Sequence, residues 1–182
     1  MYVRILNEGL QIKEVGPEEM NSVLDRHFAN VYANRADEKY VFSATEEATA
    51  KIKTRKDNDL RYRLSLVAYK NGDPVGWHYG YATDAESYYM QNSAVIESER
   101  KQGYYGALLD AVIEKIGLEG FQVITSTHHS NNAPILIPKL KKGFVISGVT
   151  FHERFRFLLE MKYFYNAERR KAYNQKLGLD LA

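Results

Sequence analysis

The chain has 182 residues, of which 45% are hydrophobic and 26% are charged. These fractions are close to those of globular proteins and exclude a collagen, a disordered tail and a disulfide-built miniprotein. The sequence contains no cysteine, which excludes disulfides, thiolate nucleophiles and cysteine-ligated metal sites. The formal net charge of +2 is too small to hold a polyanion through a general field.

Length and hydropathy also set expectations for domain number and location. No apolar run approaches the roughly 18 residues that span a bilayer, and the first residues lack an apolar signal core. We therefore expect a cytoplasmic protein with no membrane partner. A single domain is expected over residues 1–182, with a core of about 10–162 and a helical extension over 163–182.

The first predicted elements are a strand that begins at Leu10 and a helix that begins at Pro17, a residue favoured at the first helical position. Apolar residues at helical spacing continue that helix: Met20, Val23, Leu24, Phe28 and Val31. The polar segment 34–59 predicts a second helix plus a loop, where substrate selectivity often lies.

Three antiparallel strands are predicted next. Residues 64–69 and 75–81 flank Asn71 and Gly72, and an Asn-Gly pair between such runs is a strong hairpin signal. A third strand covers residues 88–96. The following helix begins near Gln102, because its apolar residues share one face: Leu108, Leu109, Val112, Ile113 and Ile116.

The remaining elements are a strand over residues 121–127, a short helix opened by residues 131–134, a hairpin of strands 144–149 and 151–161, and a helical tail over 166–176. Strands come first and helical crossovers later, which predicts an α/β fold with a mixed, mostly antiparallel central sheet flanked by helices.

The loop between the third strand and its helix predicts an anion site. Free backbone N–H groups lie at the positive end of such a helix, Gly103 permits close approach, and Arg100 and Lys101 add charge. The spacing matches neither the G-x-x-x-x-G-K-[ST] loop of nucleoside triphosphatases nor the G-x-G-x-x-G loop of dinucleotide-binding enzymes, so both classes are disfavoured.

The same loop resembles the coenzyme A loop of the GCN5-related N-acetyltransferases, the GNAT family. That pattern is Arg or Gln, two residues, Gly, one residue, and Gly or Ala. Arg100 and Gly103 match it, and Tyr105 replaces the small residue. Asn132 and the Gly143–Phe144 pair are similar to the family's N-x-x-A…K-x-G-F signature.

The resemblance implies a GNAT-like acyl-CoA N-acyltransferase fold and transfer of an acetyl group from acetyl-CoA to a primary amine of an unidentified acceptor. The absence of cysteine and of helically spaced histidines predicts no metal. The strand end would pair with the pantetheine amides, and an N–H near Ala94 and Val95 would polarise the thioester carbonyl. The implied coenzyme-binding residues are Ala94, Val95, Ile96, Arg100, Lys101, Gln102, Gly103, Tyr104, Tyr105 and Asn132.

The catalytic groups are less well matched to the family. Glu97, just beyond the strand end, is the predicted general base, with Glu99 as the alternative; either is otherwise a solvated loop carboxylate. The family's usual acid, a tyrosine four residues before the Gly-Phe pair, is replaced by Lys139. Tyr104 or Tyr105 takes its role, or the thiolate leaves without a dedicated donor.

Two alternative functions follow from these residues. The missing tyrosine favours an acyl-CoA-binding regulatory protein of the same fold without catalysis. Arg169, Arg170 and Lys171 in the tail suggest a nucleic-acid-associated module, which the small net charge disfavours. The tail can instead pack on a second copy to form a homodimer.

The sequence does not assign a single role to three histidines. His128 and His129 point to opposite sides of an extended segment, which disfavours a shared metal. His78 faces either an acceptor pocket or a neighbouring strand. The acceptor pocket is expected to involve the 34–59 segment and the hairpin near Thr150, together with three strand residues: Tyr79, Tyr81 and Tyr88.

Overall fold

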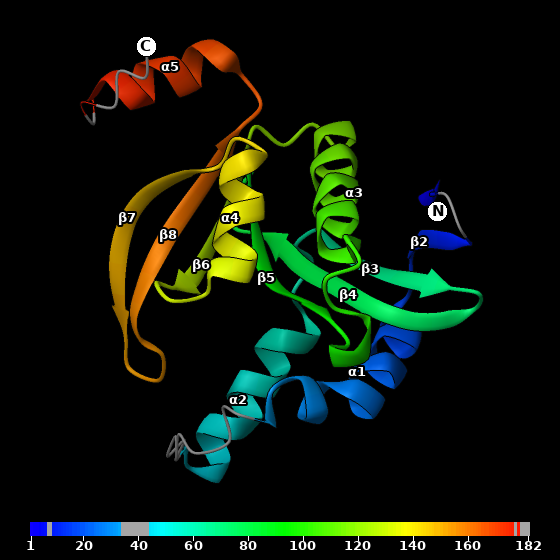
Figure 1. The fold of residues 1–182 in the computed structure, drawn as a ribbon. Helices are drawn as coiled ribbons and strands as arrows, with labels where there is room; N and C mark the ends of the chain where they lie inside the picture. Colours follow the sequence, from blue (N-terminus) through cyan, green and yellow to red (C-terminus); the bar gives the residue numbers. More distant parts are fainter. Residues whose placement is uncertain (7–8, 34–43, 177, 179–182) are drawn as a thin grey trace.

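The computed structural model describes residues 1–6, 9–33, 44–176 and 178 (Figure 1). Its elements are β1 (Val3–Ile5), β2 (Leu10–Glu14), α1 (Pro17–Val31), α2 (Glu46–Asp57), β3 (Arg63–Lys70), β4 (Asp73–Ala82), β5 (Ser87–Val95), the 3₁₀ turn η2 (Glu97–Glu99), α3 (Tyr104–Leu118), β6 (Val123–His129), α4 (Ala133–Lys141), β7 (Val145–His152), β8 (Arg156–Phe164) and α5 (Ala167–Lys176).

The strands form one eight-stranded sheet in the order β1-β2-β3-β4-β5-β6-β8-β7. Every neighbouring pair is antiparallel except β5 and β6, which run parallel. The predicted mixed, mostly antiparallel sheet is therefore confirmed. The parallel pair is connected through α3, as expected for a strand that returns in the same direction.

Alternate residues of the central strands supply two hydrophobic layers, because successive strand side chains point to opposite faces. Leu64 and Leu66 of β3 pack in the cluster that contains Leu108 and the rest of the apolar face of α3. Val67 packs in the opposite cluster with Trp77 and residues of α1. Figure 1 shows α3 and α4 on one side of the sheet and α1 on the other.

Two elements differ from the sequence-based expectation. The three-residue strand β1, which pairs with β2, was not predicted, because three residues are too few to show a period. The last hairpin turns between His152 and Arg156, whereas Thr150, where the turn was expected, lies inside β7. No Gly or Pro marks this turn; instead the His152 ring accepts the N–H of Arg154 at 3.1 Å.

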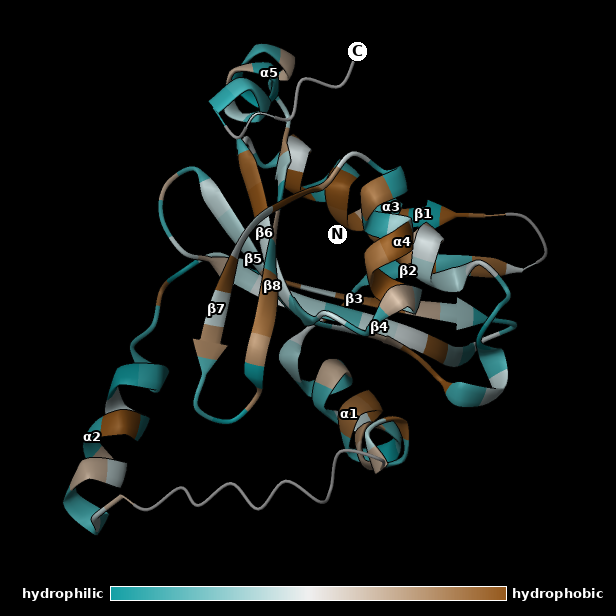
Figure 2. Cartoon of the chain, turned by 60° about the vertical axis from the view of Figure 1, so that its left-hand side comes forward, coloured by the Kyte–Doolittle hydropathy of each residue, from teal (hydrophilic) through white to brown (hydrophobic). Residues whose placement is uncertain are grey.

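The predicted second helix is present as α2, while residues 34–43 of the same predicted segment lie outside the described residues. Thr45 caps α2 by accepting the N–H of Ala48, and no residue of the helix is buried. Figure 2 shows mostly hydrophilic residues on it. Helix α2 therefore contributes no buried residue to the core.

The tail forms α5, which packs on β8 through the rings of Tyr173 and Phe164. Arg169 makes two hydrogen bonds to the Glu86 carboxylate, at 3.0 and 2.9 Å. This charge of the predicted basic face is thus compensated within the protein. Strand β8 ends at Phe164, two residues beyond the expected core boundary.

Candidate active site

Strands β5 and β6 separate part-way along their length. Their parallel pairing covers only Ser87 to Tyr89 on β5 and Val123 to Thr125 on β6. Beyond these pairs, β5 continues to Val95 beside β4, and β6 continues to His129 beside β8. The sheet therefore opens between the two strands.

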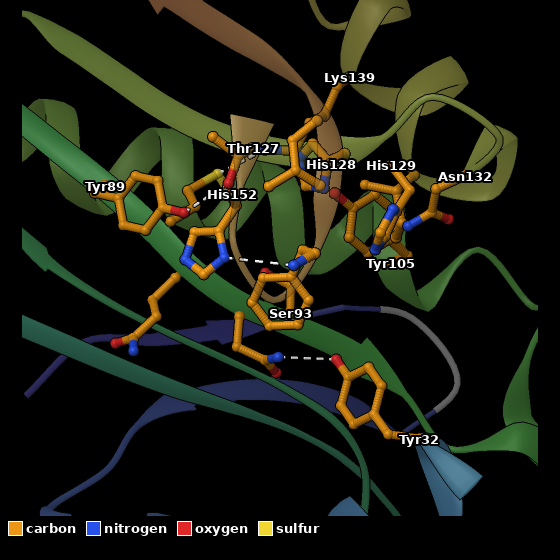
Figure 3. Close-up of a pocket in the computed structure, with 16 residues that line it drawn as sticks. Tyr32, Tyr89, Ser93, Tyr105, Thr127, His128, His129, Asn132, Lys139 and His152 are labelled. Carbon is orange, nitrogen blue, oxygen red and sulfur yellow. Dashed lines mark hydrogen bonds between the residues drawn. The ribbon is translucent and has the colours of Figure 1, made fainter. Parts of the chain in front are cut away.

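A cavity of about 210 Å³ lies at this opening (Figure 3). Strands β5 and β6 supply much of its wall, helices α3 and α4 close one side, and the β7–β8 hairpin closes another. The lining residues are Tyr32, Tyr89, Met90, Gln91, Asn92, Ser93, Tyr105, Thr127, His128, His129, Asn132, Ile135, Lys139, His152, Phe155 and Leu158.

A β-bulge in β5 lies in the cavity wall. Tyr79 pairs with Asn92 and Gly80 pairs with Met90, so Gln91 is an extra residue in β5. A bulge bends its strand and interrupts the ladder. The bulge thus helps direct the second half of β5 away from β6.

The second half of β5 offers the gap a backbone edge that no described strand covers, although the Val95 carbonyl accepts from Arg100 Nε at 3.4 Å. The N–H of Ile96 bonds the Val75 carbonyl of β4 at 2.9 Å, and Ala94, two residues earlier, faces the same way. Because N–H and C=O groups alternate in direction along a strand, Ser93 and Val95 face the gap. Of the three predicted strand-end residues, only Val95 therefore presents its N–H to the cavity side.

The predicted anion loop leads directly into the N-terminus of α3. Gly103 is the N-cap with φ of 82°, and no side chain caps the helix. The first helical bond runs from Ala107 N–H to the Gly103 carbonyl, which leaves the preceding N–H groups of the first turn unpaired by the helix. A Cβ at Gly103 or Gly106 would meet no atom within 4 Å, so this terminus has room for a phosphate group.

The two tyrosines of this loop point to different places. Tyr104 lies under the Lys70 ammonium of β3, 5.6 Å from its ring centroid, and does not line the cavity. Tyr105 does line it, together with Asn132, the N-cap of α4. The Tyr105 hydroxyl is buried and has no hydrogen-bond partner among the described residues, and burial raises its pKa.

Glu97, the predicted base, lies at the surface in η2. Its side chain is 77% exposed and pairs with Arg100 at 3.4 Å, and it is not among the cavity-lining residues. Glu99 pairs with Lys70 at 3.6 Å. The structure therefore gathers the residues of the predicted anion loop at one end of β5 but leaves both carboxylates outside the cavity.

His78 faces the neighbouring strand β5. The ring is fully buried, with Nδ1 hydrogen-bonded to Ser93 Oγ and Nε2 to Tyr88 Oη, both at 2.8 Å. Burial and the nearby Lys139 charge lower the pKa of His78 to about 3, so the ring is neutral at physiological pH. His78 thus supports the cavity wall from behind.

Lys139 is the site residue whose environment sequence reasoning missed. Its side chain is 1% exposed, and its ammonium donates to Ser126 Oγ at 2.7 Å and to Met90 Sδ at 3.1 Å. Burial lowers the pKa of Lys139 to about 7. One sequence signal could have indicated that Lys139 faces inward. Ile135 and Lys139 are four residues apart, so they lie on the same face of the helix.

Only part of the predicted acceptor pocket lines this cavity. The predicted hairpin does, through His152, Phe155 and Leu158, whereas Tyr79, Tyr81, Tyr88 and the described residues 44–59 do not. At the opposite wall, Asn92 donates to Tyr32 Oη at 2.9 Å and accepts from Trp77 Nε1 at 2.8 Å. The structure thus fixes an aromatic and polar surface on which an acceptor can lie.

The family comparison decides the identity of this fold. The model of the acetyltransferase (GNAT) family matches residues 28–136, more than half of the chain. The chain belongs to the GNAT family. The match includes β5, the anion loop, α3 and β6, which build the open edge and part of the cavity of this GNAT protein, while most of α4 and the β7–β8 hairpin lie beyond it.

Solved structures agree on the fold. An N-acetyltransferase from Staphylococcus aureus Mu50 superposes with a TM-score of 0.63 at 17% identity, covering 86% of this chain and 99% of that one. The ribosomal-protein-S18-alanine N-acetyltransferase from Escherichia coli gives 0.62 at 15%, covering 85% and 93%. The yncA protein from Salmonella typhimurium, solved with acetyl-CoA, gives 0.62 at 16%, covering 86% and 94%.

A comparison with curated proteins found no match. The predicted GNAT resemblance and the GNAT-like fold are confirmed by the family model and the solved structures. In the described residues of this GNAT protein, no helix is both long and apolar enough to cross a membrane. The same residues contain no cluster of three His, Asp or Glu side chains suited to hold a metal ion.

Proposed function

We propose that this GNAT protein transfers an acetyl group from acetyl-CoA to a primary amine. The observation that carries the proposal is the continuity of one binding path. The open edge of β5 at Ser93 and Val95 runs into the uncapped N-terminus of α3, and a cavity opens beside that edge. An extended amide chain that ends in phosphates fits an open strand edge followed by a helix N-terminus.

Each part of this path has a role in binding. Arg100, Lys101 and the first N–H groups of α3 would hold the pyrophosphate, since charge and free donors both favour an anion there. The backbone carbonyl of Val95 would accept a hydrogen bond from a pantetheine amide N–H. Tyr105 and Asn132 line the cavity where the thioester would enter.

The chemistry is attack of a neutral amine nitrogen on the thioester carbonyl carbon. The C–N bond forms, the C–S bond breaks, the nitrogen loses a proton and the thiolate gains one. The N–H of Val95, on the open edge of β5, would polarise the carbonyl oxygen of the thioester. The closed walls of α4 and the β7–β8 hairpin would limit water around the thioester.

The base stays as predicted, Glu97, which would act through water from its exposed position. We expect Glu97→Gln to reduce kcat about tenfold, less than the roughly hundredfold or more of a directly positioned base, and to leave coenzyme A affinity unchanged. Steady-state thiol release measures the first and thermal titration the second. Glu99→Gln, which removes the alternative base in the same turn, is measured in parallel, and a larger loss there would move the role to Glu99. Unchanged kcat in Glu97→Gln would remove this residue from the mechanism.

The free hydroxyl of Tyr105 gives a second test of the path. We expect Tyr105→Phe to leave the free energy of unfolding within about 0.5 kcal/mol of wild type, because no hydrogen bond within the protein is lost. Acetyl-CoA affinity should fall several-fold, because the hydroxyl is then missing as a partner for the bound thioester. Urea unfolding and thermal titration measure the two effects. Unchanged affinity would mean that this hydroxyl does not contact the coenzyme.

The proposed activity is tested by thiol release from acetyl-CoA with a panel of small amines, amino acids and peptides with free N-termini. Transfer predicts thiol release that depends on both enzyme and amine, with an acetylated amine as product. Coenzyme binding without release for any amine would favour the regulatory alternative, which the absence of a tyrosine at Lys139 motivates. A nucleic acid whose gel mobility the protein shifts at low salt, with loss of the shift as salt is added, would favour the nucleic-acid alternative.

A further inference from the structure

Lys139 carries a buried ammonium with no counter-ion in the described part of the chain. Its Nζ donates to Ser126 Oγ and Met90 Sδ and lies 4.5 Å from the Phe144 ring centroid. No ion pair joins it to a carboxylate of a described residue. Burying an uncompensated charge opposes folding, and a methionine or leucine would fill this space without that cost.

A hydrogen-bonded chain connects this ammonium with the cavity. Lys139 Nζ donates to Ser126 Oγ at 2.7 Å, and Ser126 Oγ is bonded to His128 Nε2 at 3.0 Å. His128 is partly exposed and lines the cavity together with Lys139 (Figure 3). A proton therefore has a path of two hydrogen bonds between a histidine at the cavity and the buried amine.

The chemistry of these three groups suits proton return. Ser126 both donates and accepts, so it relays a proton in either direction. A histidine ordinarily titrates near neutral pH and exchanges protons with solvent. Other titratable groups lie near these three: His78 and Tyr88 behind the cavity wall, and Tyr89, Tyr105, His129 and His152 in the wall itself. His78 is neutral, and burial raises the pKa of the three tyrosines. Among the described residues, the hydrogen bonds join only His128, of the three cavity histidines, to Lys139 through Ser126.

We propose that Lys139 is the catalytic acid that protonates the coenzyme A thiolate, and that Ser126 and His128 return the proton from solvent. This inference rests on the proposed function, which brings the thioester into the cavity that Lys139 lines. When the C–S bond breaks, the sulfur takes its electron pair and then one proton from the Lys139 ammonium. The neutral amine regains a proton through Ser126 from His128, and the proton lost by the acceptor nitrogen goes to solvent.

The ionisation of bound coenzyme A tests the inference without an acceptor. The ultraviolet absorbance of the thiolate is followed against pH for coenzyme A bound to wild type, Lys139→Met and Lys141→Met. Lys141 is the matched control, an exposed lysine on the same helix. An adjacent ammonium favours the thiolate, so the pKa of the bound thiol in wild type should lie about one unit or more below its ordinary value of about 8.5.

Lys141→Met should match wild type, and Lys139→Met should return the pKa of the thiol to its ordinary value or above. Thermal stabilisation by coenzyme A shows whether each variant is folded and loaded. Equal thiol pKa values in loaded wild type and Lys139→Met would overturn the inference and leave the proposed function standing. The wild-type measurement can also overturn the inference by itself, if the pKa of the bound thiol lies at or above its ordinary value. No stabilisation of wild type by coenzyme A would refute the proposed function itself.

Turnover provides an independent readout, with hydroxylamine as a small acceptor. An acid must be protonated, so the kcat of wild type should fall as pH rises past the pKa of Lys139, about 7. In Lys139→Tyr that alkaline fall should move to higher pH, because the ordinary pKa of tyrosine is about 10. His128→Ala should lower kcat and keep coenzyme A affinity. A pH profile identical in wild type and Lys139→Tyr would contradict the assignment.

Discussion

Replacing Lys139 with methionine should raise the free energy of unfolding at pH 7 by about 3 kcal/mol. Burial lowers the pKa of this amine from the ordinary 10.5 to about 7. That difference corresponds to about 4 to 5 kcal/mol in favour of unfolding at pH 7 and below, and to less as the pH rises toward 10.5. The lost hydrogen bond to Ser126 offsets about 1 kcal/mol of the gain.

The gain should depend on pH in a defined direction. Between pH 7 and 10.5 the unfolded chain binds more protons at Lys139 than the folded protein does, so wild-type stability rises with pH through this window. Lys139→Met lacks that rise. Its gain in the free energy of unfolding over wild type should be full below pH 7 and should vanish near pH 10.5. Urea unfolding at pH 7 and pH 9.5 measures it, with Lys141→Met as the control. A variant less stable than wild type at pH 7 would contradict the burial of a charged amine.

Replacing Gly103 with aspartate should weaken coenzyme A binding at least a hundredfold. The site is the N-cap of α3, where free N–H groups and the helix dipole favour an anion from the ligand. An aspartate here would cap the helix itself and place a negative charge against the phosphates. The two effects act in the same direction on affinity.

Gly103→Asn separates charge from conformation. The φ of 82° at Gly103 is in the left-handed region, and Asn tolerates it better than most residues. Both variants should therefore lose about 1 kcal/mol of stability or less. Asn should weaken coenzyme A binding much less than Asp does, as measured by thermal titration. Equal affinity of Gly103→Asp and wild type would exclude this helix terminus as the phosphate site.

Local patterns predicted the scaffold of the site. The Asn71–Gly72 turn, both with positive φ, produces the β3–β4 hairpin as expected. The apolar face of α3 is buried as its spacing predicts, through Leu108, Leu109, Val112 and Ile116. Gly103 is left-handed at the helix start, where the loop pattern requires a glycine. In each case the signal lies within a few neighbouring residues.

The cavity walls depend on contacts between distant segments, which such patterns do not encode. The sequence pattern predicts that Lys139 is an exposed lysine in a short basic helix. In the structure it points inward, while Ile137 and Leu140 are exposed by 51% and 45%. The reason is the register of α4 on the sheet, which places the Ile135 and Lys139 face against β5 and β6. The same limit applies to His78 of β4. Its place in the strand does not say what its ring contacts, and the ring's partner, Ser93, is set by the register between β4 and β5.

The most direct measurement of the central claim is thermal unfolding of the wild-type protein across a titration with acetyl-CoA. A ligand that binds only the folded state stabilises it by about 2.7 kcal/mol at a hundredfold excess over its Kd. The account predicts a Tm that rises steadily with the logarithm of acetyl-CoA concentration and a similar rise with coenzyme A. A Tm that stays constant with both ligands would contradict the proposed acetyl-CoA site.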